Sequence, residues 1–130
     1  MIPAEVRTVR TWHEALNGGD WERLVALSDP EVEVGGPRGS GRGSALLREW
    51  VERASIRVQP GRIFRNAEGV VVEQRAEWRD AATGGVTGVQ TVASVFTVRD
   101  GKVASVLRYD TLPDALDAVG LDAAHELRPS

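Results

Sequence analysis

The chain has 130 residues, 42% of them hydrophobic and 27% charged, which is the composition of one globular domain with its own core. Cysteine is absent, which excludes disulfides, thiolate metal sites and cysteine nucleophiles. The net charge of −3, with the signs mixed along the chain, excludes the basic footprint of a nucleic-acid binder. No apolar run reaches membrane-span length, so we expect a soluble, cytoplasmic protein without membrane contact.

The first part of the chain predicts three helices. A helical stripe of apolar residues ends at Gly18-Gly19, where glycine accepts the left-handed conformation of a helix C-terminus. Asp20 can cap a second helix, which Asp29-Pro30 stops. The third helix is predicted from Ser44 to about Arg53.

The remaining segments predict strands and turns. A short strand over 31–34 is followed by a glycine-rich loop over 35–43. Segments rich in Val, Ile, Thr and aromatic residues predict strands near 55–65, 70–79, 88–98 and 102–110. Asp100-Gly101 marks a tight hairpin, and a short helical turn is expected over 113–119. Helices followed by an antiparallel meander predict an α+β fold, with one domain over 1–122 and a frayed tail over 123–130.

Residues 70–79 carry ionisable side chains at every second position. These are Glu73, Arg75, Glu77 and Arg79, and the residues between them are Val72, Gln74, Ala76 and Trp78. Side chains alternate across a strand, so the ionisable groups share one face. Two interpretations stay open. The charged face meets water while the apolar face packs on the core, or the charged face lines a cavity.

The order of these elements resembles the nuclear transport factor 2 superfamily, and within it the SnoaL-like group. Three segments carry the likeness: Trp12-His13-Glu14-Ala15-Leu16-Asn17-Gly18-Gly19-Asp20, Asp29-Pro30-Glu31-Val32-Glu33-Val34 leading to Gly41-Arg42-Gly43, and Val95-Phe96-Thr97-Val98-Arg99-Asp100-Gly101-Lys102-Val103 running into Arg108-Tyr109. The resemblance implies a cone-shaped α+β barrel, with three N-terminal helices packed on a curved, mostly antiparallel sheet and a pocket between them. It does not define the chemistry, because the group mixes cyclases, isomerases and epoxide hydrolases.

Two well-understood branches of this superfamily can be compared with the chain residue by residue. Ketosteroid isomerases carry a tyrosine, an aspartate base and a second acid. The corresponding positions here are Trp12, a position near Gly35, and Ser94. The catalytic scheme of these isomerases is therefore absent. Limonene-epoxide hydrolases carry Arg-x-Asp on one strand, which resembles Arg75-Ala76-Glu77. Their second aspartate falls on Arg108, with Asp110 two residues further along.

Both comparisons imply that the face of Arg75 and Glu77 is the concave, pocket-lining face. Ser94, Phe96, Val106, Arg108 and Asp110 would then also point inward. Val72, Ala76 and Trp78 would lie on the convex face, where such proteins often form a homodimer. Trp12 and Trp50 either form an aromatic wall for a flat ligand or pack between helices and sheet.

Two hypotheses follow for function. In the first, the protein is a cofactor-independent hydrolase or isomerase acting on a small apolar or polyketide-like molecule. Glu77 or Asp110 is then the general base, Arg75 and Arg108 stabilise charge, and Trp12, Trp50, Ser94, Phe96 and Val106 line the pocket. In the second, the same cavity binds a small molecule without catalysis. Two histidines, one in the expected tail, leave no histidine metal site, and no cofactor is expected.

Overall fold

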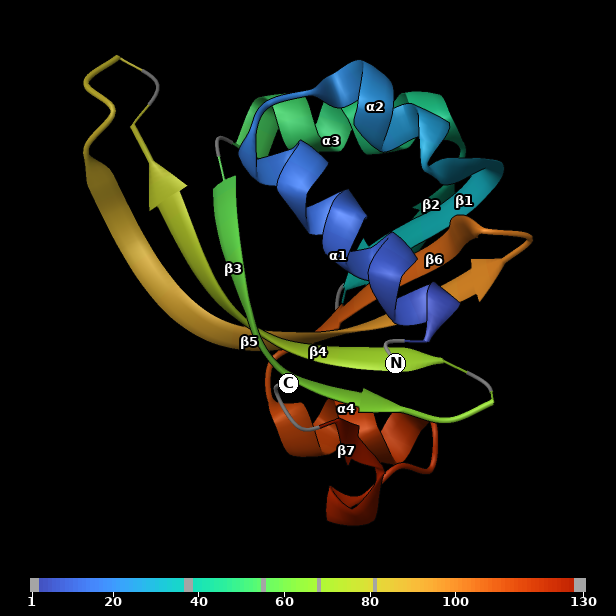
Figure 1. Cartoon of the computed structure of the whole chain (residues 1–130). Coiled ribbons are helices and arrows are strands. Elements are labelled where there is room, and N and C mark those ends of the chain that lie inside the picture. Colours follow the sequence, from blue (N-terminus) through green and yellow to red (C-terminus); the bar gives the residue numbers. More distant parts are fainter. Residues whose placement is uncertain (1–2, 37–38, 55, 68, 81, 128–130) are drawn as a thin grey trace.

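The computed structural model describes residues 3–36, 39–54, 56–67, 69–80 and 82–127. Its helices are α1 (Ala4–Asn17), α2 (Trp21–Ala26), α3 (Ser44–Ala54) and α4 (Leu112–Ala118), with a 3-10 turn over Ala123–His125. Its strands are β1 (Ser28–Gly36), β2 (Gly39–Arg42), β3 (Ile56–Arg65), β4 (Val70–Arg79), β5 (Val86–Arg99), β6 (Lys102–Tyr109) and β7 (Glu126–Leu127). The three predicted N-terminal helices and the long strands of the meander are confirmed (Figure 1).

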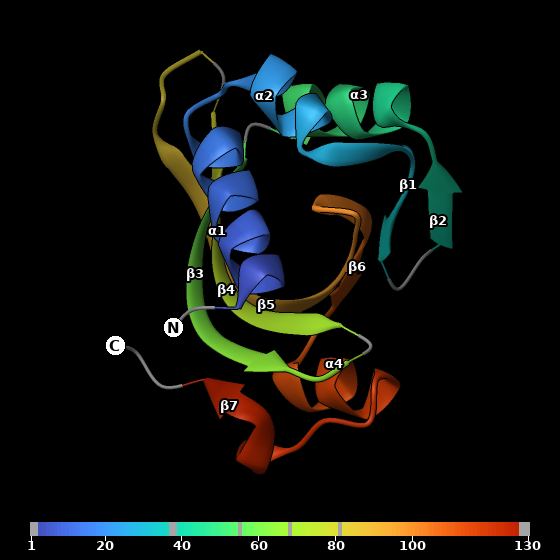
Figure 2. The same cartoon turned by 45° about the vertical axis from the view of Figure 1, so that its right-hand side comes forward.

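The strands form one strongly curved sheet in the order β2-β1-β6-β5-β4-β3-β7. All neighbouring pairs are antiparallel except β1 and β6, which run parallel. Helices α1, α2 and α3 lie on the concave side of the sheet, and α4 lies on the outer side (Figures 1 and 2). The predicted α+β fold is confirmed, with an open sheet, and the short helical turn predicted over 113–119 is the helix α4 on its outer side.

The end of α1 also ties the helix to the sheet. Gly19 has a φ of 69°, which terminates α1, and the Asp20 carboxylate accepts a hydrogen bond from the Arg23 amide to cap α2. The Asn17 amide donates to the carbonyl oxygen of Val58 at 2.7 Å and accepts from its N–H at 2.8 Å. Asn17 therefore occupies the free edge of β3 as a neighbouring strand would.

Two apolar clusters cover the two faces of the sheet. The inner cluster joins Val6, Val9 and Trp12 of α1 and Leu47 and Val51 of α3 to Val58, Val72, Phe96 and Val106 of the sheet. The outer cluster joins Phe64, Val71, Ala93 and Val95 of the sheet to Ala115 of α4 and to Leu121. Residues 71 and 72 of β4 thus point to opposite faces, and this fixes the direction of every other side chain along that strand.

The orientation predicted for β4 is wrong. Val72 and Ala76 are buried, and Val72 belongs to the inner cluster under the helices. By alternation, Arg75 and Glu77 lie on the outer face, and the Arg75 side chain is 55% exposed. The apolar residues of this strand pack on the core, as the simpler interpretation of the pattern expects. The charged ones lie on the opposite face, where Arg75 is exposed and Glu77 is half-buried.

This orientation removes the apolar surface on which the predicted homodimer was based. Val72 and Ala76 are core residues, and Trp78 shares their parity on β4. The outer face at this point carries Arg75, Glu77 and, on β5, Thr91 and the exposed Val89. Formation of a homodimer stays a prediction.

Two short strands were not expected from the sequence. Gly39–Arg42 forms β2, paired with β1, in the middle of the predicted loop, of which residues 37 and 38 lie outside the described part. Glu126–Leu127 forms β7 against β3, within the predicted frayed tail, of which residues 128–130 are likewise not described. An ion pair between Arg62 and Glu126 at 2.9 Å accompanies this pairing.

Candidate functional site

A cavity of about 550 Å³ lies between the β1–β2 hairpin, α3 and the end of β6, and it opens to solvent. It is lined by Val34, Gly35, Gly36, Gly39, Ser40, Gly41, Leu46, Trp50 and Arg108. This volume is within the range of small-molecule binding sites. The described part of the lining combines aliphatic and aromatic surface with a single charged side chain, that of Arg108.

The floor of the cavity is nearly free of side chains. Val34 pairs with Gly41 and Gly36 pairs with Gly39, so these four residues share one face of the hairpin. Because three of the four are glycines, the hairpin leaves space under α3 that side chains would otherwise fill. The glycines thus create the cavity without the need for a distorted backbone at Gly36 or Gly41.

The roof of the cavity is a second apolar stripe on α3. Leu47 and Val51 point into the core, while the neighbouring Leu46 and Trp50 are 38% and 41% exposed and border the cavity. Leu46 and Trp50 are four residues apart and therefore stand on the same side of the helix. Two large apolar side chains kept partly in water beside a cavity form a surface suited to a flat, apolar ligand.

Arg108 supplies the only charge that the described residues bring to the cavity wall. The Nε atom is buried and has no hydrogen-bond partner in the described structure. A Cβ atom built on Gly36 would lie 3.8 Å from this Nε, so the backbone of β1 encloses the base of the guanidinium group. The rest of the side chain is half-buried and faces the cavity.

A buried chain of hydrogen bonds crosses the concave face beside this cavity. His13 Nδ1 lies 2.8 Å from the Val9 carbonyl oxygen, His13 Nε2 lies 2.8 Å from Gln74 Nε2, and Ser94 Oγ donates to Gln74 Oε1 at 2.7 Å. A carbonyl can only accept, so Nδ1 carries the proton and Nε2 accepts from the Gln74 amide. These three hydrogen bonds are therefore all satisfied with His13 neutral.

Burial favours this neutral form of His13. Burial of the imidazole lowers the pKa of His13 from 6.5 to about 4, and the hydrogen bond with Val9 acts in the opposite direction. His13 therefore carries no charge near neutral pH and ties α1 to β4. Ser94 pairs with Arg108 across β5 and β6, so this series of hydrogen bonds ends next to the charged residue of the cavity wall.

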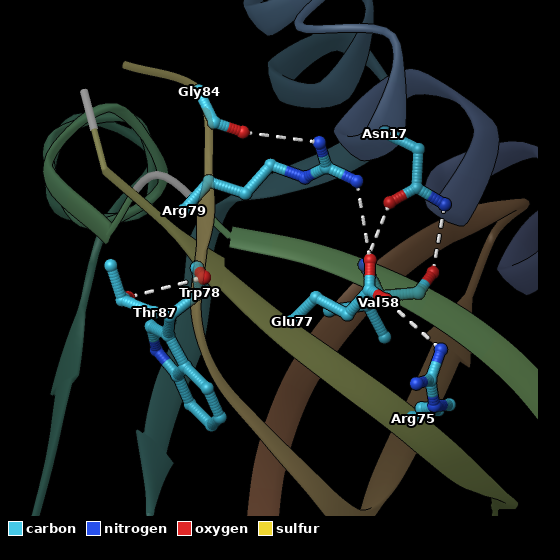
Figure 3. Close-up of polar contacts among 8 residues, drawn as sticks. All are labelled: Asn17, Val58, Arg75, Glu77, Trp78, Arg79, Gly84 and Thr87. Carbon is cyan, nitrogen blue, oxygen red and sulfur yellow. Dashed lines mark hydrogen bonds and ion pairs between the residues drawn. The ribbon is translucent and has the colours of Figure 1, made fainter. Parts of the chain in front are cut away.

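The other predicted catalytic residues lie elsewhere. Glu77 forms ion pairs with Arg75 at 2.9 Å and with Arg79 at 3.3 Å, beside Asn17 at the outer edge of the β3–β4 pair (Figure 3). Arg79 also donates to the Gly84 carbonyl. Asp110 follows β6 and is exposed. The structure therefore separates Arg75 and Glu77 from Arg108.

Of the five predicted ligand-binding residues, only Trp50 borders the cavity. Trp12 is buried, donates to Ser28 Oγ at 3.1 Å and packs edge-on against Phe96 with ring centroids 5.3 Å apart. Phe96 and Val106 point inward as predicted but belong to the inner core, and Ser94 is held by Gln74. The interior of the cone is thus filled with side chains, and the cavity lies at its rim.

Three contributors to this region were missed from the sequence. Gly36 and Leu46 shape the cavity, and Gln74 links His13 to Ser94. Gln74 could have been found as the one polar residue on the apolar face of its strand, since a buried amide needs partners. The described residues contain no group of three or more His, Asp or Glu side chains placed to hold a metal ion. No helix in the described part is long and apolar enough to cross a membrane.

A search of curated protein sequences finds no relative of this chain. Among solved structures, a candidate polyketide cyclase from Xanthomonas campestris pv. campestris is 25% identical and aligns over 85% of this chain and 93% of its own, with a TM-score of 0.65. The epoxide hydrolase/cyclase-like enzyme SalBIII, from pyran ring formation in salinomycin, is 19% identical, with coverages of 85% and 92% and a TM-score of 0.72. TerC, co-crystallised with polyporic acid, is 18% identical, with coverages of 88% and 99% and a TM-score of 0.71.

A family model for the SnoaL-like domain matches residues 9–106, from α1 to β6. This match spans well over half of the chain. It includes most of α1, all of α2 and α3, the strands β1 to β5, most of β6, and every cavity-lining residue named above except Arg108. The chain therefore belongs to the SnoaL-like domain family.

Proposed function

We propose that this protein binds a small, flat, largely apolar molecule in the cavity between the β1–β2 hairpin, α3 and β6. The observation that carries this proposal is the pairing of an open cavity of about 550 Å³ with the two exposed apolar side chains of Leu46 and Trp50. TerC, which shares the fold, was co-crystallised with polyporic acid. A polyketide-like molecule is the corresponding ligand class for this chain.

Binding without acid–base catalysis is favoured by the composition of the cavity. No described residue that lines it is a carboxylate or a histidine. His13, the buried histidine, is enclosed at 1% exposure and hydrogen-bonded through both nitrogens. A general base needs to reach the proton that it abstracts, and among the described residues no carboxylate or histidine borders this cavity.

A second candidate is a cofactor-independent hydrolase or isomerase, with Arg108 stabilising negative charge that develops on a substrate oxygen. The observation that favours it is the guanidinium group of Arg108, which has no partner among the described residues, since such a donor is suited to an oxyanion. The predicted catalytic roles of Arg75, Glu77 and Asp110 do not extend to this version, because none of the three lines the cavity.

Isothermal titration calorimetry with a panel of bicyclic and tricyclic aromatic compounds tests the proposal. Trp50→Ala is expected to weaken binding at least about tenfold, because a stacked indole contributes on the order of 1.4 kcal/mol. Arg48→Ala, on the exposed side of the same helix, is the matched control and is expected to bind as the wild type does.

Failure of the wild-type protein to bind any member of the panel would contradict the proposal. Equal affinities of wild type and Trp50→Ala would contradict the assignment of the cavity. Incubation of bound ligands with the wild type and Arg108→Met, followed by mass spectrometry, separates the two candidates. Turnover by the wild type that is lost in Arg108→Met would support the enzymatic one, and intact ligand in both samples would support binding alone.

A further inference from the structure

We infer that the ligand of this cavity is an organic anion and that Arg108 holds its acid group. The inference rests on the proposed function and deepens it, because it names the chemical class of the ligand. It states that a flat aromatic body lies against Trp50 and Leu46, while a carboxylate or an enolate oxygen pair faces the guanidinium group. It also makes Gly36 a residue that determines specificity.

The charge of Arg108 is not balanced by the described parts of the protein. Arg108 forms no ion pair and no side-chain hydrogen bond within them, and the cavity lining contains no carboxylate. By contrast, Arg62, Arg65, Arg75 and Arg79 each contact a glutamate. A partly desolvated cation without a counter-ion is unfavourable, and a bound anion removes this penalty.

The direction of the guanidinium group specifies how an anion would be bound. Gly36 and the backbone of β1 enclose Nε, so the two terminal nitrogens are the part that remains available to the cavity. These nitrogens present parallel N–H donors, which match two oxygens of one planar acid group. A carboxylate or a β-keto enolate has this geometry.

The opposite wall defines the rest of the ligand. Trp50 and Leu46 offer apolar surface from α3, and the glycine floor offers backbone with no side chains to obstruct a ring. A free inorganic anion would leave this apolar surface in water. We therefore expect an aromatic acid of two or three rings, with the acid group at one end, to bind more tightly than phosphate or sulfate.

Gly36 sets the distance between Arg108 and the floor. The methyl group of an alanine would make ordinary contacts of 3.8 to 3.9 Å with the Arg108 side chain, so Gly36→Ala is expected to fold and to keep the cavity. A leucine would project into the space beside the guanidinium group. Gly36→Leu is therefore expected to reduce anion binding at least about tenfold, and Gly36→Ala is its control.

The test compares 2-naphthoic acid with its neutral isostere 2-naphthamide, by calorimetry on the full chain. For the wild type we expect the acid to bind at least about tenfold more tightly than the amide, and the preference to decrease as salt increases. Arg108→Met is expected to bind both compounds equally, and Arg108→Lys to keep part of the preference. Arg75→Met, which removes an arginine on the outer face, is expected to keep all of it.

Folding of the variants is checked by thermal unfolding. Because Arg108 has no side-chain partner among the described residues, Arg108→Met is expected to unfold at the temperature of the wild type or above it. The Arg108 Nε–H cross-peak in a ¹H–¹⁵N spectrum is a direct second readout, and it is expected to shift with the acid and much less with the amide.

The outcomes separate the two proposals. Equal binding of acid and amide by the wild type would overturn the anion inference and leave the binding function intact. An acid preference that survives in Arg108→Met would overturn the role of Arg108. No binding of either compound, or of any other aromatic probe, would overturn the proposed function and this inference with it.

Discussion

His13 shows how one buried side chain links the fold to pH. Its pKa falls from 6.5 to about 4 through burial, whereas an unfolded chain protonates the imidazole near 6.5. The folded state therefore binds fewer protons between these two pH values. The stability contributed by neutral His13 is complete above pH 6.5 and is lost as the pH falls towards 4.

On acidification, we expect the protonation of His13 to lower the unfolding free energy by about 3 kcal/mol. This follows from about 1.4 kcal/mol for each unit of difference between the folded and unfolded pKa. Urea denaturation at about pH 7 and about pH 4.5 measures the loss. The His13→Gln variant, which cannot titrate here, is expected to lose much less stability over the same interval. An equal loss in both proteins would contradict the assignment.

Gln74 provides the sharpest residue-level test of strand orientation. Gln74→Met retains the length of the side chain but removes the partners of His13 and Ser94, and we expect it to reduce the unfolding free energy by about 2 to 4 kcal/mol. Arg75→Met, one position further along on the outer face, is expected to change it by less than about 0.5 kcal/mol. A larger loss in the Arg75 variant would restore the inward orientation that the structure rejects.

The β1–β2 hairpin is the element on which the cavity depends, and its glycines are not equivalent. A Cβ atom on Gly35 would lie 2.5 Å from Ser40 Cβ and 2.8 Å from the Gly39 carbonyl oxygen, which is too close for either to accommodate. Gly35→Ala is thus expected to destabilise the protein by about 1 to 3 kcal/mol. Gly36→Ala, whose Cβ would meet Arg108 no closer than 3.8 Å, is the control. Equal urea midpoints for the two variants would contradict this distinction.

The strong local signals of the sequence predicted most elements correctly. Asp20 caps α2 as expected, and Asp100 and Gly101 both adopt the positive φ values of a tight hairpin turn. The strand β2 was missed because glycine and serine carry no alternating apolar pattern, and its pairing is set by β1 alone. Residues 126–127 were missed because a two-residue strand has almost no periodicity.

The site was harder to predict than the elements, for a reason of register. A shift of one residue exchanges the two faces of a strand, and the comparison with epoxide hydrolases placed Arg75 and Glu77 on the concave face. The apolar and polar alternation of β4 alone gave the observed orientation. Arg108 and Trp50 were identified, but their joint cavity depends on a hairpin that the sequence did not indicate.

At the scale of the whole molecule, the homodimer is the prediction with the least structural support. The outer face near Arg75 carries the charges of Arg75 and Glu77 beside the exposed Val89, so a dimer formed through it would depend in part on these charges and weaken as salt increases. Sedimentation velocity over a range of protein and salt concentrations measures this. We expect a salt-sensitive dimer, and a monomer under all conditions would contradict the prediction.

The whole-molecule claim is that ligands enter at the rim of the cone, between the hairpin and α3, and not at the ion cluster behind the sheet. The most direct measurement is a titration of ¹⁵N-labelled protein with 2-naphthoic acid, followed in ¹H–¹⁵N spectra. We expect the largest shifts at the amides of Gly35, Gly41 and Arg108 and at the Trp50 indole N–H. Shifts centred on Arg75 and Glu77, with the Trp50 indole unchanged, would contradict it.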